Sequence, residues 1–148
     1  MQILHIQPSL AEVSVQHLGA ISIVRLCRPK KRNAISDGVM AAIGQRFEEL
    51  PSSTRAVVID GEGDHFCAGL DLSELKDRDA AEGLQHSRSW HKILTAIEFG
   101  SVPIVAALHG AVVGGGLELA SACHIRVADE TTFFALPEGS RGIFVGGG

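Results

Sequence analysis

Two glycine-rich stretches and two glutamates are the parts of this sequence best suited to chemistry. The stretches are FCAGLDL at residues 66–72 and HGAVVGGGLELA at residues 109–120, and the glutamates are Glu118 and Glu138, the second within LPEG. Glycine turns let a ligand approach the backbone closely, so main-chain N–H groups there can bind a developing oxyanion. Two carboxylates in apolar surroundings suit proton transfer. The combination predicts an enzyme that acts on an activated carbonyl group.

The two glycine-rich stretches supply different parts of this predicted oxyanion site. In the first, Ala68 and Gly69 lie where a strand passes into a helix, and the amide of Ala68 is predicted to point outward as one donor. An ordinary tight loop explains that motif equally well when it is taken alone. In the second, Gly114, Gly115 and Gly116 separate an apolar strand from a helix, whose positive end favours negative charge. Gly115 is the predicted second donor.

Two nucleotide-binding motifs compete for the second stretch, and neither fits. Gly114 and Gly116 have the spacing of the first two glycines of GxGxxG, but Leu119 occupies the third glycine position. A phosphate-binding Walker loop would need a following Gly-Lys-Ser or Gly-Lys-Thr, which the sequence lacks.

Each glutamate also has a purely structural interpretation. Glu118 falls in the first helical turn, where a carboxylate stabilises the helix dipole, and this is the favoured explanation when Glu118 is taken alone. Glu138 follows Pro137 in a turn, where an exposed loop glutamate is common. Their association with two glycine turns favours catalysis, because acid and base work on one substrate requires two positioned proton carriers. Asp71 is interpreted as a helix cap. His65 and His109 are both interpreted as structural residues.

Composition limits the classes of protein to which the chain can belong. Its 148 residues are 45% hydrophobic and carry a net charge of −4, which suits one domain and offers no basic face for nucleic acid. The 3 cysteines include no CxxC, so neither a disulfide framework nor a metal site is expected. No apolar run could span a membrane, and no signal sequence is recognisable. We expect a cytoplasmic protein, and the terminal glycines 146–148 suggest a sequence that is cut short.

The hydrophobic pattern predicts a parallel α/β fold in which strands and helices alternate. A hairpin is expected first, and a helix capped by Ser36 or Asp37 follows it and ends before Pro51. The remaining expected elements are strand 55–60, a short helix at 72–76, a helix across 84–97, strand 103–109, helix 115–122, and strands 124–127 and 132–136.

Several of these motifs, in this order, resemble the crotonase superfamily, also called the enoyl-CoA hydratase/isomerase family. RPKKRNAIS at residues 28–36 is similar to its N-terminal segment, and FCAGLDL and HGAVVGGGLELASACHIRVAD are similar to its two oxyanion motifs. The similarity continues through PEGSRGIFVGGG. The resemblance implies a spiral of ββα units, truncated before the C-terminal helices, in a single domain that is incomplete at its C-terminus. It also implies a homotrimer or hexamer.

The resemblance implies an enoyl-CoA hydratase that adds water in the syn sense to a 2-enoyl-CoA. The amides of Ala68 and Gly115 would polarise the thioester carbonyl, Glu118 would deprotonate water, and Glu138 would protonate the α-carbon. No separate cofactor is implied, because CoA is part of the substrate, and no metal, membrane or nucleic-acid partner is expected. The residues implied to contact the acyl-CoA are Arg28, Lys30, Lys31, Arg32, Ala34, Ala68, Gly69, Leu70, Asp71, Leu72 and Gly115.

Two alternatives to hydration remain open at the level of sequence. The same oxyanion site serves double-bond isomerisation or thioester hydrolysis in other members of the family. A non-catalytic fragment that binds acyl-CoA or a protein partner is the second alternative. Because the helices that the resemblance implies after residue 148 are absent from this sequence, the 148 residues alone are expected to expose apolar surface and to self-associate.

Overall fold

The computed structural model describes residues 10–74, 79–142 and 145–146. Its larger sheet has five strands in the order β1-β2-β3-β4-β6. Strand β1 (Val13–Leu18) runs antiparallel to β2 (Ile21–Leu26), whereas β2, β3 (Ala56–Gly61), β4 (Ile104–Leu108) and β6 (Ile125–Ala128) pair in parallel. The predicted hairpin and the largely parallel sheet are thereby confirmed.

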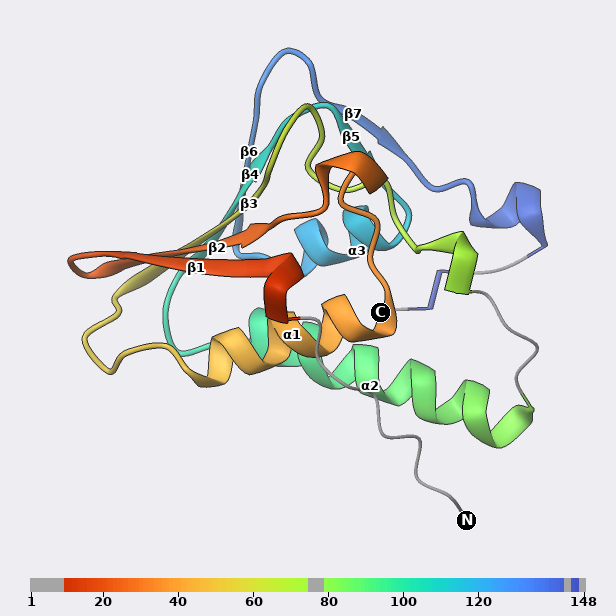
Figure 1. The fold of residues 1–148 in the computed structure, drawn as a ribbon, viewed down its shortest axis with the longest axis horizontal. Coiled ribbons are helices and arrows are strands. Elements are labelled where there is room, and N and C mark those ends of the chain that lie inside the picture. Colours follow the sequence, from red (N-terminus) through yellow and green to blue (C-terminus); the bar gives the residue numbers. More distant parts are fainter. Residues whose placement is uncertain (1–9, 75–78, 143–144, 147–148) are drawn as a thin grey trace.

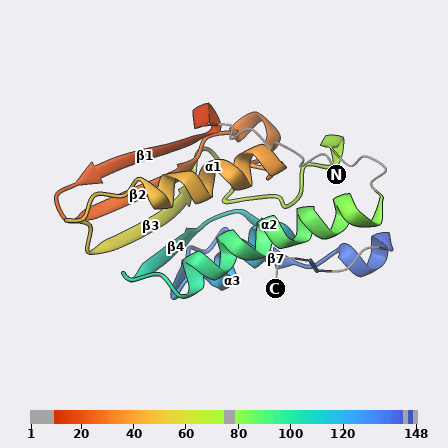
Figure 2. The same ribbon diagram turned by 90° about the horizontal axis from the view of Figure 1, so that it is seen from below.

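Helices α1 (Asp37–Glu48) and α2 (Ala80–Glu98) run side by side below this sheet, and α3 (Gly115–Ala122) lies between them and the strands (Figures 1 and 2). Four 3₁₀ turns complete the described helical elements: η1 (Leu10–Glu12), η2 (Pro29–Lys31), η3 (Leu72–Glu74) and η4 (Glu138–Arg141). The bounds predicted for the helix at 115–122 are confirmed. Of the short helix expected at 72–76, residues 75 and 76 lie outside the described residues.

Capping and packing explain the two long helices. Ser36, rather than Asp37, is the N-cap of α1, and its hydroxyl accepts a hydrogen bond from the Val39 amide (3.1 Å). Asp79 and Glu82 form a reciprocal capping box at the start of α2. Both helices bury one apolar face against alternate residues of β2, β3 and β4, as the helical and strand periodicities predict.

A second, two-stranded sheet lies beside α3 and was not anticipated. Strand β5 (Ala111–Val113) pairs in parallel with β7 (Phe133–Ala135), and β5 belongs to the glycine-rich stretch that was interpreted as a turn. Strand β7 agrees with the strand predicted over 132–136. Strand β5 ends at Val113 and α3 begins at Gly115, so the hydrogen bonds of this small sheet hold the residues that lead into α3.

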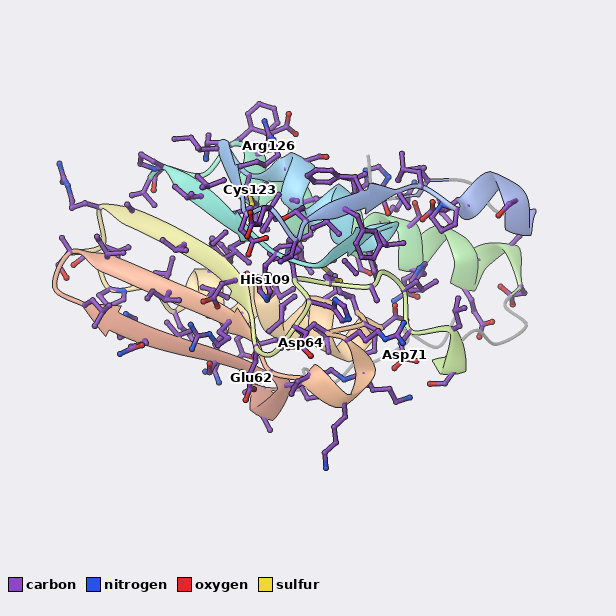
Figure 3. The ribbon with its side chains drawn as sticks, turned by 90° about the horizontal axis from the view of Figure 1, so that it is seen from above. Glu62, Asp64, Asp71, His109, Cys123 and Arg126 are labelled. Carbon is purple, nitrogen blue, oxygen red and sulfur yellow. The ribbon has the colours of Figure 1, made fainter. Side chains whose placement is uncertain are left out.

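Asn33 joins the loop after β2 to the loop after β3. It is 1% exposed and adopts a left-handed conformation (φ 55°), which asparagine tolerates better than most residues. Its Oδ1 accepts a hydrogen bond from the Arg28 amide (2.9 Å), and its Nδ2 donates to the carbonyls of Glu62 (2.9 Å) and His65 (2.7 Å). Glu62 lies on the second of these loops, beside Asp64 and near His109 (Figure 3).

Apolar side chains remain exposed on β6, on β7 and directly after β7. Ile125, Val127, Phe133, Phe134 and Leu136 are each between 50% and 58% exposed. Exposed apolar side chains of this size favour association where they gather into a patch. Within the described residues, no helix is both long enough and apolar enough to cross a bilayer.

We expect Asn33→Ala to lower the free energy of unfolding by about 3 kcal/mol, because it leaves buried main-chain groups unpaired and keeps a side chain in the left-handed region. Asn33→Gly is the matched control, since glycine adopts that conformation freely and loses only the three hydrogen bonds. Urea unfolding should rank the natural protein above Asn33→Gly and Asn33→Gly above Asn33→Ala. A glycine variant as stable as the natural protein would contradict this role for the side chain.

Candidate active site

The segment from Cys67 to Asp71 is hydrogen-bonded along both of its edges. On one edge, the Cys67 amide donates to the Ala111 carbonyl (2.9 Å), and the Cys67 carbonyl accepts from the Val113 amide (3.0 Å). On the other edge, the Ile35 amide donates to the Gly69 carbonyl (2.7 Å), and the Ile35 carbonyl accepts from the Asp71 amide (2.9 Å). These bonds determine which amides of the segment are left for a ligand.

The prediction that Ala68 supplies an oxyanion donor is wrong in this structure. The Ala68 amide donates to the Arg32 carbonyl (2.9 Å), so it is used within the fold. Arg32 and Asn33 both have positive φ angles, and this local turn brings the Arg32 carbonyl round to face Ala68. Sequence reasoning could not have seen this acceptor, because it lies on a loop 36 residues earlier in the chain (68 − 32).

Leu70 carries the free amide of this segment instead. Because Ile35 bonds to the residues on either side of Leu70, the N–H of Leu70 itself points to the opposite edge. It has no hydrogen-bond acceptor among the described residues. Gly69 precedes it with a φ of 96°, and this left-handed conformation turns the following peptide outward. A glycine immediately before the donor was therefore the signal available in the sequence.

Gly115 lies next to this segment and also has a free amide. It is the first residue of α3, and within the described residues its N–H has no acceptor. A Cβ on Gly69 would lie 2.8 Å from the Val113 carbonyl oxygen and 3.6 Å from the Gly115 nitrogen, so the two backbones are in contact. The amides of Leu70 and Gly115 thus belong to adjoining residues of two touching segments, at the positive end of α3.

The two glutamates lie beside consecutive glycines of the same turn. A Cβ on Gly115 would lie 3.7 Å from Oε2 of Glu118, and a Cβ on Gly114 would collide with Oε1 of Glu138. Glu118 is in the first turn of α3, and Glu138 is the first residue of η4. Oε2 of Glu138 is buried with no hydrogen-bond partner among the described residues, an arrangement that costs free energy unless a ligand pairs with it.

The basic cluster consists of Arg28, Lys30, Lys31 and Arg32. Its first side chain is engaged within the fold, and the other three are exposed. All three guanidinium nitrogens of Arg28 are bound within the fold: Nε to Glu12 (2.8 Å), Nη2 to Asp71 (2.9 Å) and Nη1 to the Ala34 carbonyl (2.6 Å). These three bonds give the Arg28 side chain a structural role, and its contact with acyl-CoA stays a prediction. The side chains of Lys30, Lys31 and Arg32 are exposed on the same loop.

Asp71 is a structural carboxylate, as its interpretation as a cap predicted. Its Oδ1 accepts from the Ser73 hydroxyl (2.6 Å) and the Ser73 amide (3.1 Å), at the start of η3. The Ser73 hydroxyl, then Arg28, the Ser73 amide and Lys31 lower the pKa of Asp71, whereas burial acts in the opposite direction. Because it is 5% exposed and paired with Arg28, Asp71 holds the loop carrying Leu70 against the loop carrying the basic cluster.

Histidines and cysteines near the site are engaged in the fold. His65 Nδ1 accepts from the Ala111 amide (3.1 Å), and His109 Nε2 lies 3.0 Å from the Gly63 carbonyl, which agrees with their structural interpretation. Burial raises the pKa of Cys67 to about 12 and that of Cys123 to about 12, so neither is a nucleophile near neutral pH. These histidines and cysteines are therefore assigned no chemical role at the site.

Comparison with known proteins agrees with this geometry. The profile of the family described as enoyl-CoA hydratase/isomerase matches residues 16–148. A short-chain-enoyl-CoA hydratase of Clostridium acetobutylicum is 32% identical over 142 residues, which are 94% of this chain and 54% of that protein. The mitochondrial Δ(3,5)-Δ(2,4)-dienoyl-CoA isomerase of Mus musculus is 34% identical over 151 residues, covering 93% of this chain and 44% of the isomerase. The chain therefore belongs to the enoyl-CoA hydratase/isomerase family.

Solved structures match the fold closely. A crystallised protein of Rhodopseudomonas palustris, provisionally assigned as an enoyl-CoA hydratase, superimposes with a TM-score of 0.93 at 56% identity, covering 96% of this chain and 55% of that one. A Thermobifida fusca protein with the same provisional assignment, solved in complex with CoA, gives a TM-score of 0.86 at 25% identity, covering 93% and 57% of the two chains. The architecture is thus the crotonase fold, and this chain spans about half the length of the relatives it matches.

The lowered pKa of Asp71 predicts a specific loss of stability in acid. Asp71 stabilises the folded state fully above its ordinary pKa of about 3.9, and this contribution is lost as the pH falls through the lowered value. Asp71→Asn should lower the free energy of unfolding near neutral pH and flatten its decline below about pH 4. Urea unfolding of both proteins across this range measures the difference. Parallel pH profiles for the two proteins would contradict the assignment.

Proposed function

We propose that this chain carries the reaction centre of an enoyl-CoA hydratase. The observation that carries the proposal is the meeting of four groups at one turn: the free amides of Leu70 and Gly115, and the carboxylates of Glu118 and Glu138. Donors for an oxyanion and two proton carriers are the parts that addition of water to an unsaturated thioester needs. The proposed substrate is a 2-enoyl-CoA.

The two amides would stabilise the negative charge that develops on the thioester oxygen. That oxygen accepts hydrogen bonds from Leu70 and Gly115 as the β-carbon is attacked, and the positive end of α3 adds to the stabilisation. Each such donor contributes about 3 kcal/mol to transition-state stabilisation in well-ordered sites. Because both N–H groups are held by main-chain structure, they require no rearrangement when the charge forms.

The two glutamates would handle the protons of the added water. Glu118 orients the water and takes one of its protons, while the resulting hydroxyl bonds to the β-carbon and the π electrons move toward the carbonyl oxygen. Glu138 gives a proton to the α-carbon, so that one hydroxyl and one hydrogen are added on the same face. The buried Oε2 of Glu138 supports this role, since it has no hydrogen-bond partner among the described residues and could pair with a ligand.

The exposed basic side chains of Lys30 and Arg32 would bind the CoA phosphates. They lie on the loop that ends at Asn33, and Arg28 fixes the neighbouring loop by its bond to Asp71. The CoA complex of the Thermobifida fusca relative supports a CoA thioester as the substrate class. We further propose, from the family resemblance alone, a cytoplasmic homotrimer or hexamer for the natural full-length protein, which light scattering would test.

Double-bond isomerisation is the second candidate, favoured by the similarity to the mouse dienoyl-CoA isomerase. The same amides would stabilise the same enolate, but a proton would move between carbons and no water would be added. Incubation of a 2-enoyl-CoA in ¹⁸O-labelled water distinguishes the two reactions. Hydration places the label in a 3-hydroxyacyl product, whereas isomerisation leaves the product unlabelled.

We expect Glu118→Gln and Glu138→Gln each to lower kcat for crotonyl-CoA hydration by about 10²- to 10⁴-fold, because each removes one proton carrier. The affinity for CoA should change little. Exposed Glu130→Gln is the matched control and should leave kcat unchanged. Near-normal turnover by either active-site variant in the natural full-length protein would contradict the assigned roles.

Replacing single peptide bonds by esters tests which amide is the donor. Leucic acid at position 70 removes the free Leu70 N–H and should lower kcat by about 10²-fold or more, while it weakens the Gly69 carbonyl as an acceptor for the Ile35 amide. Lactic acid at position 68 removes the Ala68 N–H that binds Arg32 and should lower the unfolding midpoint. A fall in kcat only for the ester at position 68 would restore Ala68 as the donor and contradict the present assignment.

A further inference from the structure

Trp90, the only tryptophan of the chain, packs against the backbone of Gly115. It lies on α2 and is 5% exposed. A Cβ on Gly115 would lie 3.1 Å from Cζ3 and 3.5 Å from Cη2 of its indole, so the ring edge is in van der Waals contact with the first residue of α3. Oε2 of Glu118 lies 3.7 Å from the same point. The indole therefore borders the proposed donor amide and the proposed base at once.

The indole is held in place by Asp37 at the start of α1. Its Nε1 donates a hydrogen bond to Oδ1 of Asp37 (3.1 Å), across 53 residues of sequence. His86, one helical turn before Trp90, has its ring centre 5.5 Å from the indole. His86 Nδ1 also lies 2.7 Å from Oδ1 of Asp37, in a direction that forms no hydrogen bond. Three segments of the chain thus meet at one ring: the starts of α1 and α3, and the middle of α2.

We propose that Trp90 is a positioning residue for the Gly115 amide and that Asp37 fixes the indole for this purpose. The inference rests on the proposed function, in which that amide binds the thioester oxygen. A glycine has no side chain to anchor its own backbone, so the place of its N–H depends on what packs against it. The indole occupies the space into which Gly115 would otherwise move, and displacement of a donor by about 1 Å costs on the order of 10²-fold in rate.

The test compares two probes that differ at the thioester. Acetoacetyl-CoA has the thioester carbonyl oxygen that the Gly115 amide would bind, whereas free CoA has no thioester. The ratio of the two affinities therefore reports on the hydrogen bond from the Gly115 amide. Trp90→Leu in the natural full-length protein should lower this ratio and kcat for crotonyl-CoA at least about tenfold, with KM changed less than about threefold. Trp90→Phe retains a ring against Gly115 but loses the bond to Asp37, so its ratio should fall less than that of Trp90→Leu and about as far as that of Asp37→Leu.

Leu94→Ala is the matched control for a purely structural effect. Leu94 lies one turn further along α2 and, like Trp90, is 5% exposed, so its truncation destabilises the same helix. It should lower the unfolding midpoint without changing the affinity ratio. A Trp90→Leu protein with an unchanged ratio, or a Leu94→Ala protein with an equal fall, would overturn the positioning role.

Two variants of Asp37 carry the test if Trp90→Leu does not fold. Asp37→Asn and Asp37→Leu both remove the charge at the start of α1, but only asparagine keeps an oxygen that can accept from the indole. The ratio should be retained within about twofold in Asp37→Asn and should fall several-fold in Asp37→Leu. Equal ratios in the two variants would overturn the proposal. A natural protein that neither prefers acetoacetyl-CoA nor hydrates crotonyl-CoA would overturn the proposed function, and this inference with it.

Discussion

The constraint on which the site depends is that the segment 67–71 is hydrogen-bonded along both edges by parts of the chain that are remote in sequence. Ile35 holds it on one side and strand β5 on the other. Main-chain bonds engage the amides of Cys67, Ala68 and Asp71, and the left-handed Gly69 leaves the Leu70 N–H outside the pattern. The position of the Leu70 N–H, the proposed donor, is therefore set by the backbone and does not depend on side-chain rotamers. Stabilisation of a developing charge requires a donor that is fixed in this way.

The start of α3 is pressed against this segment, and only glycine permits the approach. A Cβ on Gly116 would lie 2.6 Å from the Cys67 carbonyl oxygen and 2.8 Å from its Sγ, so any side chain there would push the two donor amides apart. A Cβ on Gly114 would collide with the Glu138 carboxylate, and one on Gly115 would lie 3.1 Å from Cζ3 of the Trp90 indole, so that a neighbour would have to shift. The three consecutive glycines therefore serve three different contacts, and they link the proposed oxyanion site and proton carriers to the packing of α2.

Much of this arrangement could be predicted from sequence, because it depends on local signals. The hairpin, a helix cap at Ser36 or Asp37, and the bounds of α3 follow from turn chemistry and periodicity, which act over a few residues. Other features of the site depend on partners that are remote in sequence. Whether Ala68 or Leu70 is free depends on the carbonyl of Arg32, and whether Arg28 can meet a phosphate depends on Glu12 and on Asp71, 43 residues away. Strand β5 is only three residues long, which is too short for an alternation of apolar and polar residues to predict its pairing with β7.

The central claim is that two main-chain amides converge on the thioester oxygen of a bound acyl-CoA. The vibrational frequency of that carbonyl, isolated by ¹³C labelling of bound crotonyl-CoA and infrared difference spectroscopy, tests the claim most directly. Two converging donors polarise the carbonyl and should lower its stretching frequency well below that of the free thioester in water. A bound thioester whose carbonyl absorbs at the same frequency as in water, or higher, would contradict the account, because the amides of Leu70 and Gly115 would then not be bound to the oxygen.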